Sequence, residues 1–113
     1  MREMELNSAL AAELRSYREG RRAGDVGQQW RALERAHVLS QPMLRRHLQV
    51  HGQMLGLAIR SKDGQEIAGQ LARLVLAPLG HLTGRIPIGN TGRSNVSAFR
   101  PMVVPDDLRH LVP

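Results

Sequence analysis

The chain has 113 residues and a net charge of +6, from 16 basic and 10 acidic residues, and it contains no cysteine. This length fits one domain with a modest core, and the lack of cysteine excludes disulfides and thiolate-bound metals. No apolar run approaches the roughly 18 residues of a membrane span, and the charged N-terminus does not resemble a signal peptide. We therefore expect a cytoplasmic protein.

The positive charge raises the question of nucleic-acid binding. The aromatic residues that would stack on bases are limited to Trp30, Tyr17 and Phe99, which disfavours single-stranded and RNA partners. The arginine bias is equally expected from a GC-rich genome. A nucleic-acid partner is therefore not expected.

Four helices are predicted from the spacing of apolar residues. The first, over residues 4–22, and the second, over residues 26–39, are separated by Gly24 and by Asp25, a typical N-cap. Their predicted inward residues are Leu6, Leu10, Leu14 and Tyr17 in the first helix and Val26, Trp30 and Leu33 in the second.

The third predicted helix covers residues 42–60, and the fourth covers residues 65–79. Their predicted inward residues are Leu44, Leu48, Leu55 and Ala58 in the third helix and Ile67, Leu71, Leu74 and Val75 in the fourth. Connections this short favour antiparallel neighbours. Residues 1–82 are therefore predicted to form an all-α compact bundle of two helical hairpins.

The segment from residue 83 to residue 113 is different in character, because it holds four of the six prolines and a run of turn-forming residues. It is predicted to be an extended, turn-rich tail. Its apolar residues are Ile86, Ile88, Val96, Phe99, Met102, Val103 and Val104. They suggest that the tail docks on the bundle, so that the chain forms one domain overall.

Histidine and glutamate occur at spacings typical of metal ligands on helices. Glu34 and His37 are three residues apart, and His47 and His51 are four apart, so each pair shares a helix face. Helical phasing turns His37, His47, His51 and Glu13 inward, while His81 ends the last apolar helix. The candidate ligands are therefore Glu13, Glu34, His37, His47, His51 and His81.

Burying several polar groups is costly unless they pair with one another or share a cation. Imidazole and carboxylate ligands suit Zn, Ni, Co, Fe or Mn. With only one Glu-x-x-His step, the chain falls short of the di-iron bundle pattern, so one ion is expected. Because Leu48 follows His47, the His-Glu-x-x-His motif of zinc peptidases is absent.

A second candidate site lies in the tail. Gly92, Arg93, Ser94 and Asn95 belong to a run of turn-forming residues that could place backbone N–H groups and a guanidinium around a phosphate or carboxylate. No Gly-Lys-Ser/Thr follows, so the run is not a Walker loop. The simpler interpretation is a series of turns that closes over the bundle.

Several motifs resemble a small bacterial family catalogued only as a domain of unknown function. They are the segments 33–42 (LERAHVLSQP), 77–85 (APLGHLTGR) and 89–101 (GNTGRSNVSAFRP), together with the His47-x₃-His51 step. Proteins of this kind look like accessory members of heavy-metal-resistance gene clusters. The resemblance therefore implies a role in metal tolerance, and it supplies no established activity.

A looser resemblance is to a single tetratricopeptide-like hairpin. Gly24-Asp25, Leu33, Ala36 and a proline after the helix echo that repeat, but the proline comes one residue late and Gln29 replaces a small residue.

The sequence thus favours a non-enzymatic protein that binds a divalent transition metal for sequestration, delivery or sensing. The main alternative is a tetratricopeptide-like interaction module with a metal-free buried polar network. A metal-dependent hydrolase or oxygenase and a basic nucleic-acid binder are further alternatives.

Overall fold

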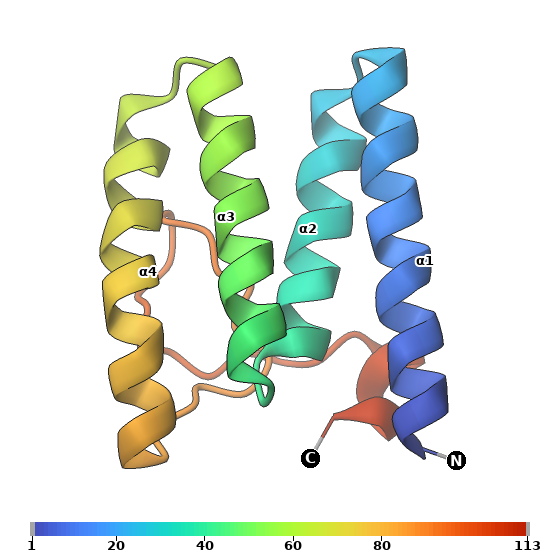
Figure 1. Cartoon of the computed structure of the whole chain (residues 1–113), viewed down its shortest axis with the longest axis vertical. Helices are drawn as coiled ribbons and strands as arrows, with labels where there is room; N and C mark the ends of the chain where they lie inside the picture. The colour runs from blue at the N-terminus through green and yellow to red at the C-terminus, as the bar shows by residue number, and fades with distance from the viewer. Residues whose placement is uncertain (1, 113) are drawn as a thin grey trace.

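The computed structural model describes residues 2–112, in which every regular element is a helix. The elements are α1 (Arg2–Ala23), α2 (Val26–Ser40), α3 (Leu44–Arg60), α4 (Gly64–Thr83) and a short 3₁₀ helix, η1 (Asp106–Leu111). The radius of gyration of 13.2 Å is close to the value of about 13 Å expected for a compact chain of this length. The prediction of a compact, all-α fold is therefore confirmed (Figure 1).

The helix ends follow local hydrogen bonding. Asp25 and Asp63 cap α2 and α4, since their side chains accept from the backbone N–H groups of Gln28 and Glu66. The third helix begins at Leu44, two residues later than predicted, and its N-cap Met43 donates its N–H to Ser40 O at 2.8 Å. Pro42 therefore lies in the turn.

The fourth helix ends four residues later than predicted. It continues through Pro78 to Thr83, and Gly84 then adopts the left-handed conformation at φ 73°. Glycine adopts this conformation at little cost, so Gly84 gives the helix a favourable end. The extension keeps His81 within α4.

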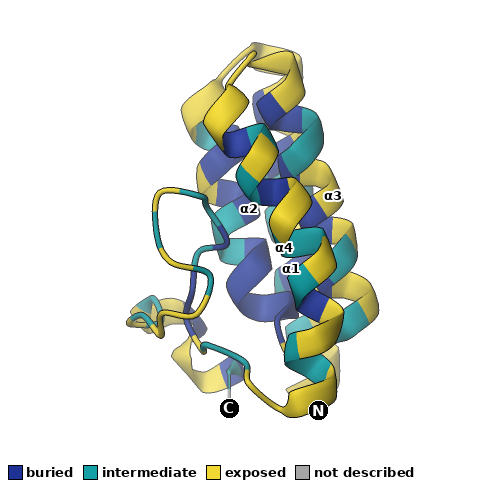
Figure 2. Cartoon of the chain, turned by 90° about the vertical axis from the view of Figure 1, so that its left-hand side faces the viewer, coloured by how far each residue is buried: buried dark blue, intermediate teal, exposed yellow. Residues whose placement is uncertain are grey.

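The helices form two hairpins, α1–α2 and α3–α4, that meet between α2 and α3. In Figure 1, α1 and α4 lie at opposite edges of the array. The core is buried between the hairpins and beneath η1 (Figure 2). Its largest side chains are Leu10, Tyr17, Trp30, Leu33, Leu39, Val50, Met54, Leu57, Leu108 and Leu111. Among residues 2–112, no helix is long and apolar enough to cross a membrane.

Several predicted inward residues are wrong. Val26 is exposed at the start of α2. Leu71 and Val75 are exposed, because the α4 face that meets α3 and the tail carries Glu66, Gln70 and Ala77 instead of an apolar stripe. In α3 the buried face is rotated from the predicted one. It consists of His47, Val50, His51, Met54, Leu57 and Ala58.

The tail returns from the end of α4 to α1, where η1 packs (Figure 1). This short helix was not predicted, and its Leu108 and Leu111 are the tail residues that join the core. Ile88, Phe99 and Val103 are exposed, so their predicted docking is wrong. Polar contacts hold much of the remaining tail.

Asn90 organises the tail. Its Nδ2 group donates to Ser97 O and Arg100 O at 2.9 and 2.7 Å, and its Oδ1 accepts from the N–H of Gly92 at 2.8 Å. With an exposed fraction of 2%, Asn90 replaces water for all of these backbone groups.

We predict that Asn90→Ala lowers the free energy of unfolding by about 2–4 kcal/mol, because it leaves one buried and two partly buried backbone groups without their partner. Urea denaturation would measure the change. Asn95→Ala, at an exposed position of the same tail, should change stability by less than about 0.5 kcal/mol. Equal effects of the two substitutions would contradict the role assigned to Asn90.

Candidate metal centre

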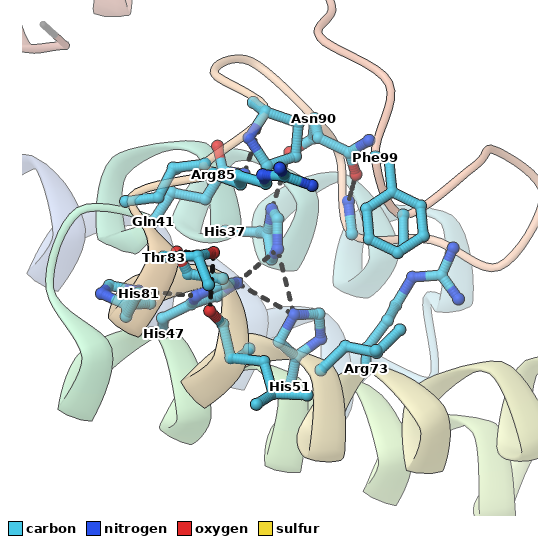
Figure 3. A pocket seen from close by; sticks show the side chains of 18 residues that line it. His37, Gln41, His47, His51, Arg73, His81, Thr83, Arg85, Asn90 and Phe99 are labelled. Carbon is cyan, nitrogen blue, oxygen red and sulfur yellow. Dashed lines mark hydrogen bonds between the residues drawn. The ribbon is translucent and has the colours of Figure 1, made fainter.

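Three buried histidines point their ring nitrogens at one another. His37 lies on α2, and His47 and His51 lie one turn apart on α3. The distances between their Nε2 atoms are 2.9 Å for His37–His47, 3.0 Å for His47–His51 and 3.1 Å for His37–His51. Among residues 2–112, these three form the one group of potential ligands close enough to share a metal ion (Figure 3). We call this group the histidine triad.

Asn90 and Gly92 fix the ring of His37. The Nδ1 atom lies 2.6 Å from Asn90 O, which can only accept, so Nδ1 carries the proton. Gly92, at φ +82°, lies against the ring, and a Cβ atom there would come within 2.5 Å of His37 Cδ2. The tail therefore sets both the tautomer and the position of His37.

A chain of polar groups fixes His51. Its Nδ1 lies 2.8 Å from Gln70 Oε1, while Gln70 Nε2 donates to Glu66 Oε2 and Gly92 O, both at 2.8 Å. Both partners of Gln70 Nε2 are acceptors, so this atom must be the amide nitrogen, and the orientation of the Gln70 amide is determined. Nδ1 of His51 must therefore donate to Oε1.

Glu66 holds the end of this series of hydrogen bonds that is farther from His51. Its carboxylate accepts from Arg93 Nε at 2.8 Å and from the N–H of Ser94 at 3.0 Å. Burial opposes ionisation, but hydrogen bonds from Arg93, Gln70 and Ser94 outweigh it and lower the pKa of Glu66. The Arg93 guanidinium also stacks on Trp30, 3.7 Å from the ring centroid.

His47 has a different partner, since its Nδ1 lies 3.3 Å from His81 Nε2. Either histidine can donate in this contact. When His47 donates, all three Nε2 atoms of the triad present lone pairs. His81 thus lies behind the triad, where it can orient a ligand instead of acting as one.

The triad is held in its neutral form. Burial, followed by the neighbouring His51 and His47, places the pKa of His37 well below its ordinary value. Burial, then His51 and His81, lowers the pKa of His47 to about 3. Burial also lowers the pKa of His51 to about 4 and outweighs the hydrogen bond to Gln70. Neutral imidazole is the form that binds a metal.

The two predicted carboxylate ligands lie elsewhere, paired with arginines. Glu34 Oε2 lies 3.2 Å from Arg93 Nη1. Glu13 Oε2 lies 2.9 Å from Arg35 Nε, and Arg35 also pairs with Asp107 of η1. The structure therefore brings together His37, His47 and His51, with His81 adjacent, and leaves both glutamates outside the triad.

The tail run considered for an external anion instead holds an internal one. Arg93 and Ser94 bind the Glu66 carboxylate, and Gly92 O accepts from Gln70. Asn95 is exposed. These turns lie against α4, and their polar groups complete the surroundings of His51.

A cavity of about 250 Å³ opens onto the triad between α4 and the tail. In Figure 3, His81 lies on one side of the three histidines, and Arg73 and Phe99 lie on the other. Its polar lining includes Gln41, Arg73, Thr83 and Arg85, and the rest is mainly aliphatic. A metal held by the triad would therefore face a pocket that admits a further ligand.

The sequence pattern did not predict Glu66, Gln70 and Asn90 as site residues. Glu66 and Gln70 are four residues apart on α4, a spacing that could have indicated a shared polar face. Asn90 acts through its backbone oxygen, and no residue type indicates such a role.

We predict that Gly92→Ala displaces His37 and destabilises the protein by more than about 2 kcal/mol, since both strain and a steric clash contribute. Gly24→Ala is the matched control, because Gly24 has φ +71° but no atom within 4 Å of an added Cβ. The control should lose only about 1 kcal/mol. Urea denaturation of both variants measures the difference, and equal losses would contradict contact with His37.

The lowered histidine pKa values predict that the metal-free protein becomes less stable as the pH falls below the ordinary value of 6.5. In that range the unfolded state binds more protons than the folded state, so the free energy of unfolding should fall by on the order of 1 kcal/mol per pH unit for each triad histidine. The lowered pKa of Glu66 adds its own loss only below about 4.5. Denaturation between pH 7 and pH 5 in the presence of chelator tests this.

The control for this pH dependence is His110→Gln, because His110 is exposed in η1. It should retain the full loss of stability, whereas His47→Gln combined with His51→Gln should remove most of it. An unchanged dependence in the double variant would show that other groups are responsible.

Comparison with known proteins agrees with the resemblance seen in the sequence. No curated protein and no solved structure matches the chain. One family model, described as "Protein of unknown function (DUF3703)", matches residues 4–112. The match spans nearly the whole chain. It includes the histidine triad, the helices α2, α3, α4 and η1, and all of α1 except its first two residues. The chain therefore belongs to the DUF3703 family of proteins of unknown function.

Proposed function

We propose that this protein binds one divalent transition-metal ion through the Nε2 atoms of His37, His47 and His51. The observation that carries the proposal is the convergence of these three atoms, at 2.9–3.1 Å from one another, in a buried site. Imidazole nitrogens typically lie about 2.0–2.1 Å from zinc, which is compatible with one ion touching all three.

The tautomers favour a cation over a metal-free network. His37 and His51 each use their ring proton at Nδ1, so their Nε2 atoms face each other as lone pairs at 3.1 Å. His47 can supply at most one proton to the three contacts. Protonation of the triad would supply further protons to these contacts, but burial lowers the pKa of all three histidines and so disfavours it. A shared cation satisfies every lone pair at once.

The ligand set narrows the choice of metal. Three imidazoles without thiolate suit Zn, Co, Ni, Fe or Mn. At a metal–nitrogen distance of about 2.05 Å, the observed spacing gives N–metal–N angles of about 94°, whereas a tetrahedral site would need nitrogens about 3.3 Å apart. The spacing is thus closest to three adjacent positions of an octahedron, and a small expansion would accommodate tetrahedral zinc.

The biological role that we propose is metal tolerance through sequestration, delivery or sensing. The three protein ligands leave coordination positions open toward the cavity, and an open position permits transfer of the ion to another ligand. The resemblance to accessory proteins of heavy-metal-resistance clusters supports the same role. The alternative interaction module would need no cavity beside the triad.

We expect the purified protein to bind close to one equivalent of Zn²⁺ or Co²⁺. At a free metal concentration of about 100 times Kd, binding should stabilise the fold by about 2.7 kcal/mol and raise Tm by roughly 10 °C. Elemental analysis and thermal denaturation measure the two effects.

His47→Ala should abolish the rise in Tm, because only two of the three imidazole ligands remain. His110→Ala is the matched control, since it removes an exposed histidine outside the triad. If the wild type takes up no metal, or if His47→Ala responds as the wild type does, the proposal is wrong and the metal-free interaction module gains support.

A further inference from the structure

We propose that the cavity beside the triad binds a small organic carboxylate, whose head group occupies an open position on the bound metal and whose short apolar chain fills the pocket. This inference rests on the proposed metal binding and adds the chemical class of a ligand. It follows from the charge, the unpaired polar atoms and the apolar walls of the cavity.

Charge favours an anion. Three neutral imidazoles leave the full +2 charge of a divalent ion uncompensated, unlike a site that includes carboxylate ligands. The cavity lining adds the guanidinium groups of Arg73 and Arg85 and contains no aspartate or glutamate. A cation in this partly desolvated setting is stabilised by an anion that enters with it.

Arg73 is placed to receive part of that anion. Its Nη1 and Nη2 groups donate to Gly69 O at 3.1 Å and Val96 O at 2.6 Å, while its buried Nε has no partner. Within residues 2–112, no carboxylate lies within salt-bridge distance of Arg73. Arg73 lines the same cavity as His37 and His51. Figure 3 shows Arg73 near His51.

A second unpaired atom lies in the same lining. Gln41 donates its Nε2 to Pro87 O at 2.9 Å, but its Oε1 is buried without a partner. The cavity thus offers an unpaired acceptor as well as an unpaired donor. A water molecule on another coordination position of the metal could donate to this oxygen.

The remaining walls select an organic acid over an inorganic oxyanion. The aliphatic and aromatic lining includes Leu76, Ala77, Ile86, Pro87, Ala98 and Phe99. The volume of about 250 Å³ lies just below the roughly 300–1,000 Å³ of pockets for drug-sized ligands. The pocket therefore fits an acid with only a few carbon atoms.

The test uses Co²⁺-loaded protein in a buffer that does not coordinate metals, because the visible spectrum of Co²⁺ changes when a ligand binds to it. Acetate, propionate and butyrate are titrated separately. We expect saturable spectral changes, with affinity rising up to about fourfold for each added methylene that becomes buried. Phosphate and bicarbonate test inorganic anions, and propionamide and propylamine test the need for negative charge.

Arg73→Met should weaken propionate binding about tenfold or more, because it removes a charged hydrogen-bond donor. Co²⁺ should bind at least as tightly as it does in the wild type, since Arg73 is not a ligand and its positive charge disfavours a cation at the triad. Arg45→Met is the matched control at an exposed position of α3, and it should bind propionate as the wild type does. If Arg73→Met fails to fold, the titrations of wild-type protein with the carboxylates and the comparison compounds still test the proposal.

The outcomes separate this inference from the function on which it rests. Failure to bind Co²⁺ overturns both. Co²⁺ binding with a spectrum that none of the carboxylates changes overturns the inference alone. Equal affinity from acetate to butyrate shows that no apolar chain is buried in the pocket. Tighter binding of phosphate, bicarbonate or propionamide than of propionate shows that an organic carboxylate is the wrong class. Either result overturns the inference.

Discussion

The arrangement on which the site depends is the pairing of two imidazole N–H groups with fixed oxygen acceptors. Asn90 O holds the Nδ1 proton of His37, and Gln70 Oε1 holds that of His51. With both protons placed there, the opposite nitrogens can only offer lone pairs to each other. Nothing on the rings themselves sets this orientation. It comes from the tail and from α4.

Glu66 connects these two sources. Its carboxylate binds Gln70 within α4 and also Arg93 and Ser94 of the tail, so one buried charge orients the amide and anchors the segment that covers His37. Arg93 in turn reaches Glu34 on α2 and stacks on Trp30. The run from Asn90 to Ser94 therefore forms part of the site. Docking of the tail and formation of the triad are expected to be one cooperative event.

The sequence predicted the fold well because apolar periodicity and the caps at Asp25 and Asp63 are local signals. It also placed His37, His47 and His51 on inward faces. It failed where a polar interior replaces an apolar one. The inward face of α4 carries Glu66 and Gln70, so the apolar pattern favoured Leu71 and Val75, which are exposed. Periodicity does not reveal that arginines pair with Glu13 and Glu34, since these contacts join distant segments.

The same arrangement links metal binding to stability. Without a cation, the fold must hold facing lone pairs in a site where burial also disfavours protonation. That strain is opposed by hydrogen bonds to Asn90 and Gln70 and by the packing of Gly92 on His37. A metal ion on the three Nε2 atoms would remove the repulsion and leave these supporting contacts in place. Its binding energy would therefore appear largely as stability of the docked tail, so that metal occupancy would be coupled to the shape of one surface.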